Sequence, residues 1–142
     1  MEALEEPKFK YCFIMRGVPG SGKSTVAKRI KGEEGVVHTT DNYFLNENGE
    51  YVFDRDLLAE NHKKNFQAFC KSIDEGVESV IVDNTNTTER EYKRYQEYAT
   101  EHGYVVSFVV IPHIPASVAA ARNSHGVPEE AIKNMLKRWW KM

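Results

Sequence analysis

At 142 residues and 41% apolar content, the chain is long enough for one domain with a single core and too short for two domains of ordinary size. Its 19 Lys and Arg residues nearly balance its 21 Asp and Glu residues, and the net charge of -2 excludes a general attraction to nucleic acid or anionic membranes, leaving only a local basic groove. The two cysteines, Cys12 and Cys70, lie far apart and outside any C-x-x-C pattern, which indicates neither a disulfide framework nor a zinc site, and we expect both to be reduced and structural.

The N-terminal residues carry no targeting pattern. Glu2, Glu5 and Glu6 stand where a secretory signal needs basic residues before an apolar run. No apolar stretch of the chain approaches the roughly 18 residues that a membrane span needs. We therefore expect residues 1–8 to form a disordered tail and residues 9–142 to form a single domain. We also expect the protein to be intracellular, in the cytoplasm or the nucleus, without a membrane partner.

In chain order, the first half of the sequence predicts two strands and two helices. Residues 11–15 are apolar and end at a glycine loop, which is typical of a strand buried in a parallel sheet. Helix-forming residues follow over 23–31, and a short strand follows over 36–38. Asp54 is placed to cap a long helix that ends at Gly76.

The second half continues the alternation of strands and helices. Thr88 and Glu91 predict a capping box at the start of one helix. The further elements expected here are strands over 79–82 and 104–111, helices over 88–102, 116–123 and 128–140, and a loop over 124–127. Strands that alternate with helices four times predict an α/β fold with a four-stranded parallel sheet and helices on both faces.

A phosphate-binding motif joins the first predicted strand to the first helix. Residues 17–24 are Gly-Val-Pro-Gly-Ser-Gly-Lys-Ser and match G-x-x-x-x-G-K-[ST] at every fixed position. The glycines let backbone amides face phosphate oxygens, the helix start adds its positive dipole, and the Lys23 ammonium can reach the β and γ phosphates. A chance match is expected in fewer than about one such chain in a hundred. The motif predicts a P-loop NTPase fold of the adenylate-kinase-like type that binds ATP and Mg²⁺.

The predicted nucleotide site contains residues of this motif and the residue that follows it. The Ser24 hydroxyl is short enough to ligate Mg²⁺. The other residues expected to contact the nucleoside triphosphate are Gly17, Pro19, Gly20, Ser21, Gly22, Lys23 and Thr25.

Two aspartates follow predicted strands, at the edge of the sheet where ligands of open parallel sheets bind. Asp83 ends an apolar strand and is placed to hold the water shell of Mg²⁺. Asp41 is placed to take the proton of an attacking hydroxyl. Each aspartate also has a purely structural alternative, because Asp83 can hydrogen-bond its own turn and Asp41 can cap one. Both are candidate functional residues.

Four segments together resemble the polynucleotide kinase type of phosphate-loop domain. They are residues 17–24, Thr-Asp-Asn-Tyr-Phe at 40–44, Val-Asp-Asn-Thr-Asn at 82–86 and Arg-Asn-Ser-His-Gly-Val-Pro at 122–128. The similarity extends from about Tyr11 to Trp140. It is greatest to the small kinase-like domain of a ubiquitin-ligase-binding animal protein and its short paralogues. The first motif is shared by many families, whereas the ordered set is much more specific.

The resemblance implies transfer of the γ-phosphoryl group of ATP to a hydroxyl, which in polynucleotide kinases is the 5′-hydroxyl of a nucleic acid. On this basis Asp41 matches the general base, and Lys23 holds the phosphates. Arg122 matches an arginine of a lid that closes over the triphosphate and stabilises the charge that develops during transfer. The residue pattern alone gives Arg122 less weight, because a lone helical arginine usually faces solvent. The implied catalytic residues are therefore Lys23, Asp41 and Arg122.

Two positions differ from the phage-type kinase of this family. Gly126 and Phe44 stand where that kinase has a second lid arginine and an arginine that grips the phosphate of the acceptor. Phe44 and Tyr43 can stack on a base, although such residues more often belong to a core. The differences leave two alternatives: a nucleoside or small-molecule kinase, and a nucleotide-binding interaction module with little or no kinase activity. The protein partner of such a module is not identified by the sequence.

The last predicted helix carries the aromatic pair Trp139-Trp140 next to Arg138. These residues either pack on the domain or contact a partner, and packing is the more usual arrangement. The basic side chains of the middle helices alternate with glutamates, which is typical of solvent-exposed faces.

Overall fold

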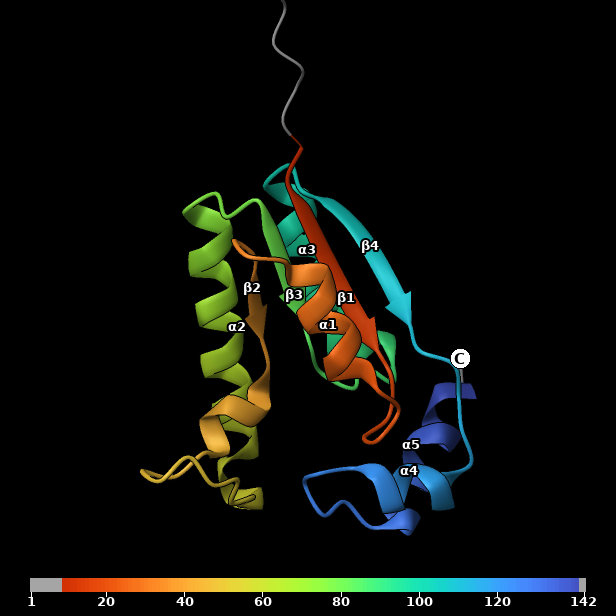
Figure 1. The fold of residues 1–142 in the computed structure, drawn as a ribbon. Coiled ribbons are helices and arrows are strands. Elements are labelled where there is room, and N and C mark those ends of the chain that lie inside the picture. Colours follow the sequence, from red (N-terminus) through yellow and green to blue (C-terminus); the bar gives the residue numbers. More distant parts are fainter. Residues whose placement is uncertain (1–8, 141–142) are drawn as a thin grey trace, which may run out of the picture.

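The computed structural model describes residues 9–140, with every side chain in this range except that of Trp140. The expected disordered tail at residues 1–8 lies outside the described residues. Strands and helices alternate along the chain as predicted (Figure 1). The elements are β1 (Tyr11–Arg16), α1 (Lys23–Lys31), β2 (Val36–His38), the 3-10 helices η1 (Thr40–Phe44) and η2 (Arg55–Leu57), α2 (Leu58–Asp74), β3 (Ser79–Val82), α3 (Glu89–Glu101), β4 (Val105–Val110), α4 (Ala116–Arg122) and α5 (Glu129–Trp140). Within the described range, none of these helices has both the length and the apolar character that crossing a bilayer requires.

The four strands are parallel and lie in the order β2-β3-β1-β4. Tyr11 of the central strand β1 pairs with Ser79 of β3 on one side and with Val105 of β4 on the other. Parallel strands put their carboxyl ends at one edge of the sheet, so the loops after β1, β2 and β3 gather there. These loops carry the predicted phosphate, base and metal residues. The predicted four-stranded parallel sheet is confirmed.

Helices cover the sheet on both faces, as predicted (Figure 1). Because side chains alternate along a strand, β1 sends Cys12 and Ile14 to one face and Met15 to the other. The first face packs against α2 and α3, whose Phe69 and Tyr95 belong to the same buried cluster. The second face packs against α1. Burial of apolar side chains on both faces is the main favourable contribution to the stability of this fold.

Local hydrogen bonds set the ends of several elements. Thr88 and Glu91 form the predicted capping box of α3. The prediction that Asp54 caps the long helix directly was wrong, because its carboxylate accepts the amide of Asp56 at 2.9 Å and caps the short 3-10 helix η2, after which α2 begins. Strand β4 is one residue shorter at each end than predicted, since the amide of Tyr104 is hydrogen-bonded to the end of α3.

Helices α4 and α5 pack against each other and on the phosphate loop. Val18 of that loop, Ala119 of α4 and Ile132 of α5 form a small buried cluster. Near the end of α5, the guanidinium carbon of Arg16 lies 4.2 Å from the ring centre of Trp139. Trp139 therefore packs on the domain, which is the alternative that the sequence favoured.

Both cysteines are free thiols, as expected. Cys12 lies in the core between the sheet and α2, where burial raises the pKa of its thiol to about 12. A thiol that stays protonated is a poor nucleophile. The role of Cys12 is therefore structural.

Candidate active site

The phosphate loop connects β1 to α1 and has the left-handed backbone that its glycines permit. Gly22 directly precedes α1 with a φ of 94°, and Gly20 has a φ of 81°. The first amides of α1, which begins at Lys23, have no partner within the helix and lie at the positive end of its dipole. Amides in this arrangement bind anionic oxygens such as those of phosphates. The loop has the local structure that the motif predicts.

Gly20 also lies directly against α4. A methyl group added at Gly20 would overlap the backbone carbonyl of Ala119, so a larger residue would push α4 away from the loop. Helix α4 ends at Arg122, about one turn after Ala119. Because Gly20 lets α4 pack directly on the phosphate loop, Arg122 at the end of α4 lies near that loop.

A second loop, residues 83–88 after β3, is fastened to the end of β1. The Asn86 side-chain amide donates to the Met15 carbonyl at 2.7 Å, and Arg16 Nε donates to the Asn86 carbonyl at 2.8 Å. With a φ of 48°, Asn86 is the only non-glycine among the described residues that has a left-handed backbone. Asparagine tolerates this conformation better than most residues. The roles of Asn86 and Arg16 were not predicted, because an asparagine in a turn is the only local signal for them.

Lys23 forms an ion pair with Asp83 beneath the phosphate loop. Their side chains are 9% and 5% exposed, so both charges are largely removed from water. Loss of either partner alone would leave an isolated buried charge, which typically destabilises a protein by about 3–5 kcal/mol. Asp83 follows β3 as predicted, and in this structure its carboxylate neutralises Lys23. Its predicted role toward Mg²⁺ stays a prediction.

Asp41 lies in η1, directly beyond the carboxyl end of β2. Thr40, the residue before Asp41, fixes this turn through two hydrogen bonds. The Thr40 amide donates to Asn84 Oδ1 at 3.0 Å, and Thr40 Oγ1 is hydrogen-bonded to His62 Nδ1 at 2.9 Å. The Asp41 side chain is 46% exposed, so its carboxylate remains accessible. The strand-end position of Asp41 is as predicted, whereas the supporting roles of Asn84 and His62 were not recognised from the sequence.

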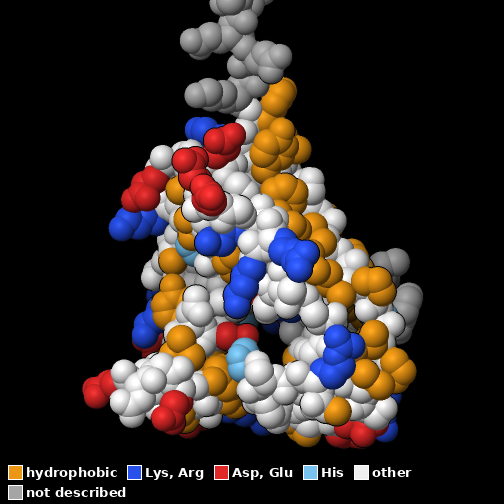
Figure 2. Space-filling model, in the orientation of Figure 1, with side chains coloured by type: hydrophobic (Ala, Val, Ile, Leu, Met, Phe, Trp, Pro, Cys, Tyr) orange, Lys and Arg blue, Asp and Glu red, His pale blue; other side chains and the backbone are white. Residues whose placement is uncertain are grey.

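A cavity of about 890 Å³ opens at this edge of the sheet. Figure 2 shows a hollow on this face with acidic and histidine side chains at its rim. Its wall is built from the phosphate loop, η1, the first turns of α2 and α3, and the segment from α4 to α5. The predicted site residues that line it are Pro19, Gly20, Gly22, Lys23, Ser24, Thr25, Asp41 and Arg122. Gly17, Ser21 and Asp83 do not belong to this wall, and the expected contacts of Gly17 and Ser21 with a nucleotide stay predictions.

The cavity is basic although the whole chain is not. Its wall carries five cationic side chains, of which Lys23 is already paired with Asp83, against the two carboxylates of Asp41 and Glu91. The five cations are Lys23, Arg90, Arg94, Arg122 and Arg138. Within the part of the chain that the structure describes, none of the four arginines forms an ion pair. Guanidinium groups that lack a carboxylate partner and gather around one cavity favour an anionic ligand.

Charged groups from α3 and η1 act on the same histidine. Burial and the guanidinium of Arg94 lower the pKa of His62, while the carboxylates of Glu91 and Asp41 oppose that shift. Burial, assisted by the carboxylate of Asp41, raises the pKa of Tyr51 to about 12. Asp41 is therefore within electrostatic range of residues on both sides of its turn.

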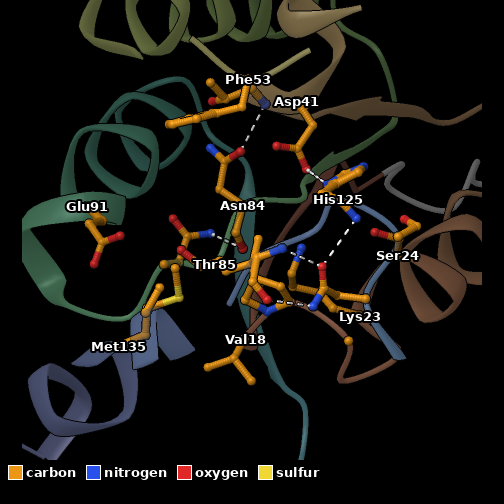
Figure 3. A pocket seen from close by; sticks show the side chains of 18 of the residues that line it. Val18, Lys23, Ser24, Asp41, Phe53, Asn84, Thr85, Glu91, His125 and Met135 are labelled. Carbon is orange, nitrogen blue, oxygen red and sulfur yellow. Dashed lines mark hydrogen bonds and ion pairs between the residues drawn. The ribbon is translucent and has the colours of Figure 1, made fainter. Parts of the chain in front are cut away.

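The loop between α4 and α5, residues 123–128, brings a histidine to Asp41. His125 Nδ1 lies 3.3 Å from Asp41 Oδ2 (Figure 3), and its ring stacks on Tyr51 with the ring centres 4.0 Å apart. This lid loop therefore reaches from the end of α4 to the wall that carries Asp41. Neither contact of His125 was predicted from the sequence, because nothing local indicates that these three residues meet.

Phe44 is a core residue and offers no free face for stacking. It is 5% exposed and packs against the rings of Tyr51 and Phe53. The alternative that Phe44 belongs to the core is confirmed. Phe53 is 52% exposed and lines the cavity, so a ligand can reach the ring of Phe53 instead.

A family match and two relatives place this chain among known proteins. Residues 13–139 match the AAA domain family. The chain belongs to this AAA domain family. Human NEDD4-binding protein 2 is 35% identical to this AAA domain over 131 residues, which cover 89% of this chain and 7% of that protein. YLP motif-containing protein 1 of Rattus norvegicus is 28% identical over 151 residues, covering 89% of this chain and 11% of that protein. The chain thus spans only a small fraction of the length of these curated relatives.

Solved structures share the fold of this AAA domain. A chain of the Pnkp1/Rnl/Hen1 RNA repair complex superposes with a TM-score of 0.73 and 24% identity, covering 94% of this chain and 45% of that chain. A gluconokinase from Sinorhizobium meliloti gives a TM-score of 0.54 and 21% identity over 93% of this chain and 76% of its own. The Mycobacterium tuberculosis APS kinase CysC gives a TM-score of 0.51 and 18% identity, covering 92% of this chain and 99% of that chain. The kinase-like P-loop fold and the resemblance to the polynucleotide kinase type of domain are confirmed.

The donor groups of the cavity fit a nucleotide that brings its own metal ion. The described residues contain no group of three or more His, Cys, Asp or Glu that would hold a metal by themselves. Ser24, whose hydroxyl is a suitable Mg²⁺ ligand, lines the cavity next to Lys23. Mg²⁺ commonly binds through one or two protein groups together with phosphate oxygens and water. Lys23 and Ser24 therefore fit Mg²⁺ bound to a triphosphate.

Proposed function

We propose that this AAA domain transfers the γ-phosphoryl group of ATP to a hydroxyl, and that its preferred acceptor is the 5′-hydroxyl of a polynucleotide. The observation that carries the proposal is the composition of one cavity. Lys23 and Ser24, which are suited to hold a triphosphate, line the same space as the half-exposed carboxylate of Asp41. Donor and acceptor would meet between the phosphate loop and η1.

On the donor side, Lys23, Ser24 and Arg122 would hold ATP with Mg²⁺. The Lys23 ammonium, now paired with Asp83, would turn part of its charge toward the β and γ phosphates. Arg122 has no ion pair among the described residues, so its guanidinium is available to the triphosphate. There it would stabilise the charge that develops during transfer. Bound Mg²⁺ would supply further neutralisation of the phosphate oxygens.

On the acceptor side, Asp41 would accept the proton of the attacking hydroxyl. Arg90 and Arg94 lie one turn apart on α3 and both line the cavity, so they can contact one polyanionic ligand. Arginines are frequent ligands of nucleic-acid phosphates, and an exposed ring such as that of Phe53 can stack on a base. The structural neighbour that belongs to an RNA repair complex supports the choice of a nucleic acid.

Two alternatives also have observations in their favour. The gluconokinase and APS kinase neighbours favour a small hydroxyl compound as the acceptor. A nucleotide-binding interaction module is favoured because the two groups proposed to act in transfer already have partners. Lys23 is paired with Asp83, and Asp41 is in contact with His125. The three functions differ in which molecule, if any, receives phosphate from ATP.

Phosphate transfer from γ-labelled ATP tests the proposal directly. The acceptors are 5′-hydroxyl DNA and RNA oligonucleotides, nucleosides and gluconate. We expect label on the oligonucleotides and at least about 100-fold less transfer by Asp41→Asn, because a general base contributes about 10²- to 10⁴-fold. Asp56→Asn is the matched control, since Asp56 is an exposed aspartate of η2 outside the cavity wall, and it should transfer as the wild type does.

The outcomes separate the three functions. Label only on nucleosides or gluconate would replace the polynucleotide with a small acceptor. A wild-type protein that binds ATP but labels nothing would refute phosphotransfer and support the interaction module. Equal transfer by the wild type and Asp41→Asn would show that Asp41 is not the base.

A further inference from the structure

Internal hydrogen bonds give the lid loop a defined shape. The side chain of Asn123 organises it through hydrogen bonds to the backbone of the same loop. Its amide donates to the Val127 carbonyl at 3.0 Å, and its oxygen accepts from the amides of His125 at 3.2 Å and of Val127 at 2.9 Å. Gly126 completes the turn with a φ of 68°. A loop with these internal hydrogen bonds presents the His125 ring in a defined direction.

The His125 ring contacts two side chains on the opposite wall of the cavity. It stacks on Tyr51 with 15° between the ring planes, and its Nδ1 faces Asp41 Oδ2 at 3.3 Å. Among the described residues, His125 is the only partner within hydrogen-bond or ion-pair distance of the Asp41 carboxylate. Figure 3 shows His125 between Asp41 and the side of the cavity that carries Lys23 and Ser24. The contact thus lies where donor and acceptor would meet.

We propose that His125 is the positioning residue of the base. When the lid covers the nucleotide, the Nδ1–H group of His125 binds Asp41 Oδ2 and turns the other carboxylate oxygen toward the acceptor hydroxyl. The inference rests on the proposed function, because it requires Asp41 to act as the base. An ionised carboxylate only accepts hydrogen bonds, so the nitrogen that faces it carries the hydrogen. The 3.3 Å contact is longer than an ordinary N–H···O bond, and hydrogen bonds of catalytic groups often tighten only in the complex with substrate.

His125 keeps its proton throughout the transfer step. The acceptor oxygen forms a bond to the γ-phosphorus while the bond between that phosphorus and the bridging oxygen of ADP breaks. The proton of the acceptor hydroxyl passes to Asp41 Oδ1. The contribution of His125 is geometric, since an aspartate side chain that is 46% exposed samples several rotamers and a fixed Oδ2 restricts them.

This arrangement couples the two substrates through one loop. Arg122, which would contact the triphosphate, stands three residues before His125. The loop that follows Arg122 therefore also holds His125 against Asp41. The Tyr51 ring supports the imidazole from the acceptor wall only while the loop lies across the cavity. One loop thus carries both a proposed triphosphate contact and the group that orients the base.

Two variants separate the N–H group of His125 from its ring. His125→Phe keeps a ring that can stack on Tyr51 and removes the N–H group, whereas His125→Asn removes the ring and keeps an N–H donor near the position of Nδ1. We expect His125→Phe to lower kcat for the oligonucleotide roughly 10- to 100-fold, in line with a misplaced catalytic group. The Kd of MgATP, measured by calorimetry, should not change. His125→Asn should recover a large part of the lost kcat.

Two further measurements complete the test. His102→Phe changes an exposed histidine at the end of α3 and should leave kcat unchanged. In an Asp41→Asn background, His125→Phe should alter kcat by less than about twofold, because no base is left to position. A wild-type kcat in His125→Phe, or an equal loss in both backgrounds, would overturn the inference and leave the proposed function standing. Absence of transfer by the wild type would refute both.

Discussion

Lys23 and Asp83 neutralise each other beneath the phosphate loop, largely shielded from water. Two charges in such surroundings are tolerated only as a pair. A triphosphate that draws Lys23 toward its oxygens would therefore need to bring a new positive partner for Asp83. Mg²⁺ with its water shell is suited to this exchange. The buried pair is a physical reason to retain Asp83 as a proposed second contact of the metal ion.

His38, the last residue of β2, is expected to make the stability of the protein depend on pH. Burial lowers the pKa of His38 from 6.5 to about 4, and its Nε2 is hydrogen-bonded to Ser72 Oγ at 2.8 Å. The unfolded chain therefore binds a proton near pH 6.5 that the folded protein binds only near pH 4. The stabilisation should be complete above pH 6.5 and decrease as the pH falls toward about 4. Urea titrations across this range measure the free energy of unfolding.

His38→Gln provides the matched comparison. The glutamine amide can still reach Ser72 but does not titrate, so the decrease between pH 6.5 and about 4 should be shallower. The pKa of His62 is also lowered, by burial and by Arg94. His62 therefore makes the free energy of unfolding decrease as the pH falls in the wild type and in the variant alike. An identical slope in both proteins would show that His38 is not its source.

Among the site residues, the sequence predicted those that belong to a contiguous motif. Lys23 and Ser24 belong to a contiguous motif, and both line the cavity. Asn86 is fastened to a residue 71 positions away, and His125 contacts a turn that is still more distant in the sequence. A single sequence carries no signal for such pairs, because only the folded sheet and lid bring them together.

Helix α4 links the nucleotide loop to the lid, and Gly20→Ala should displace it. The added methyl group would overlap the carbonyl of Ala119, and the alanine would have to keep the left-handed φ of 81°. The backbone strain alone destabilises by about 1–2 kcal/mol. The overlap adds to it, because α4 must move. We expect a lower free energy of unfolding in urea and weaker binding of MgATP by calorimetry.

Gly103→Ala separates the strain from the overlap. Gly103 has the same φ of 81°, and an added methyl group would meet nothing within 4 Å. This variant should lose about 1–2 kcal/mol of stability and bind MgATP as the wild type does. If both variants lost the same stability and bound MgATP equally, the packing of α4 would not depend on Gly20.

The helices and strands themselves were largely predictable from periodicity, glycines and caps. α1 has the predicted bounds, as do β2 and β3. The strand order β2-β3-β1-β4 and the packing of α4 and α5 on the phosphate loop were not predicted, since both arise from tertiary contacts. The helix η2 was missed because a cap signal such as Asp54 does not distinguish a 3-10 turn from the first turn of an α-helix.

For the molecule as a whole, nucleotide binding should raise thermal stability. A ligand that binds only the folded protein adds about 2.7 kcal/mol at 100 times its Kd. For a domain of this size this corresponds to roughly 10 °C in Tm. We expect MgATP to raise Tm by this order in thermal scans and Mg²⁺ alone to have no comparable effect.

Lys23→Ala is a poor test of this shift by itself, because it leaves Asp83 buried without a partner. The unliganded variant should already be about 3–5 kcal/mol less stable. The double variant Lys23→Ala/Asp83→Ala removes both charges and should show little response to MgATP. Lys28→Ala, at an exposed position of α1, should keep the full response. A full response in the double variant would mean that the phosphate loop does not hold the nucleotide.

The basic character of the cavity was invisible in the composition. The net charge of -2 reflects the sum over the chain, whereas the five cations of the wall come from the phosphate loop, α3, α4 and α5. Segments that are distant in the sequence meet only after folding, so the net charge of the chain does not predict the electrostatic potential of one cavity.

The absence of a side chain at position 20 has a consequence for how this motif is interpreted. Glycines of phosphate loops are usually explained by the approach of a ligand to the backbone. Here one missing methyl group also makes room for a neighbouring helix of the same chain. A descendant that no longer bound nucleotides would still need glycine at this position to pack α4. The presence of this glycine alone therefore indicates the packing of a helix and does not by itself indicate nucleotide binding.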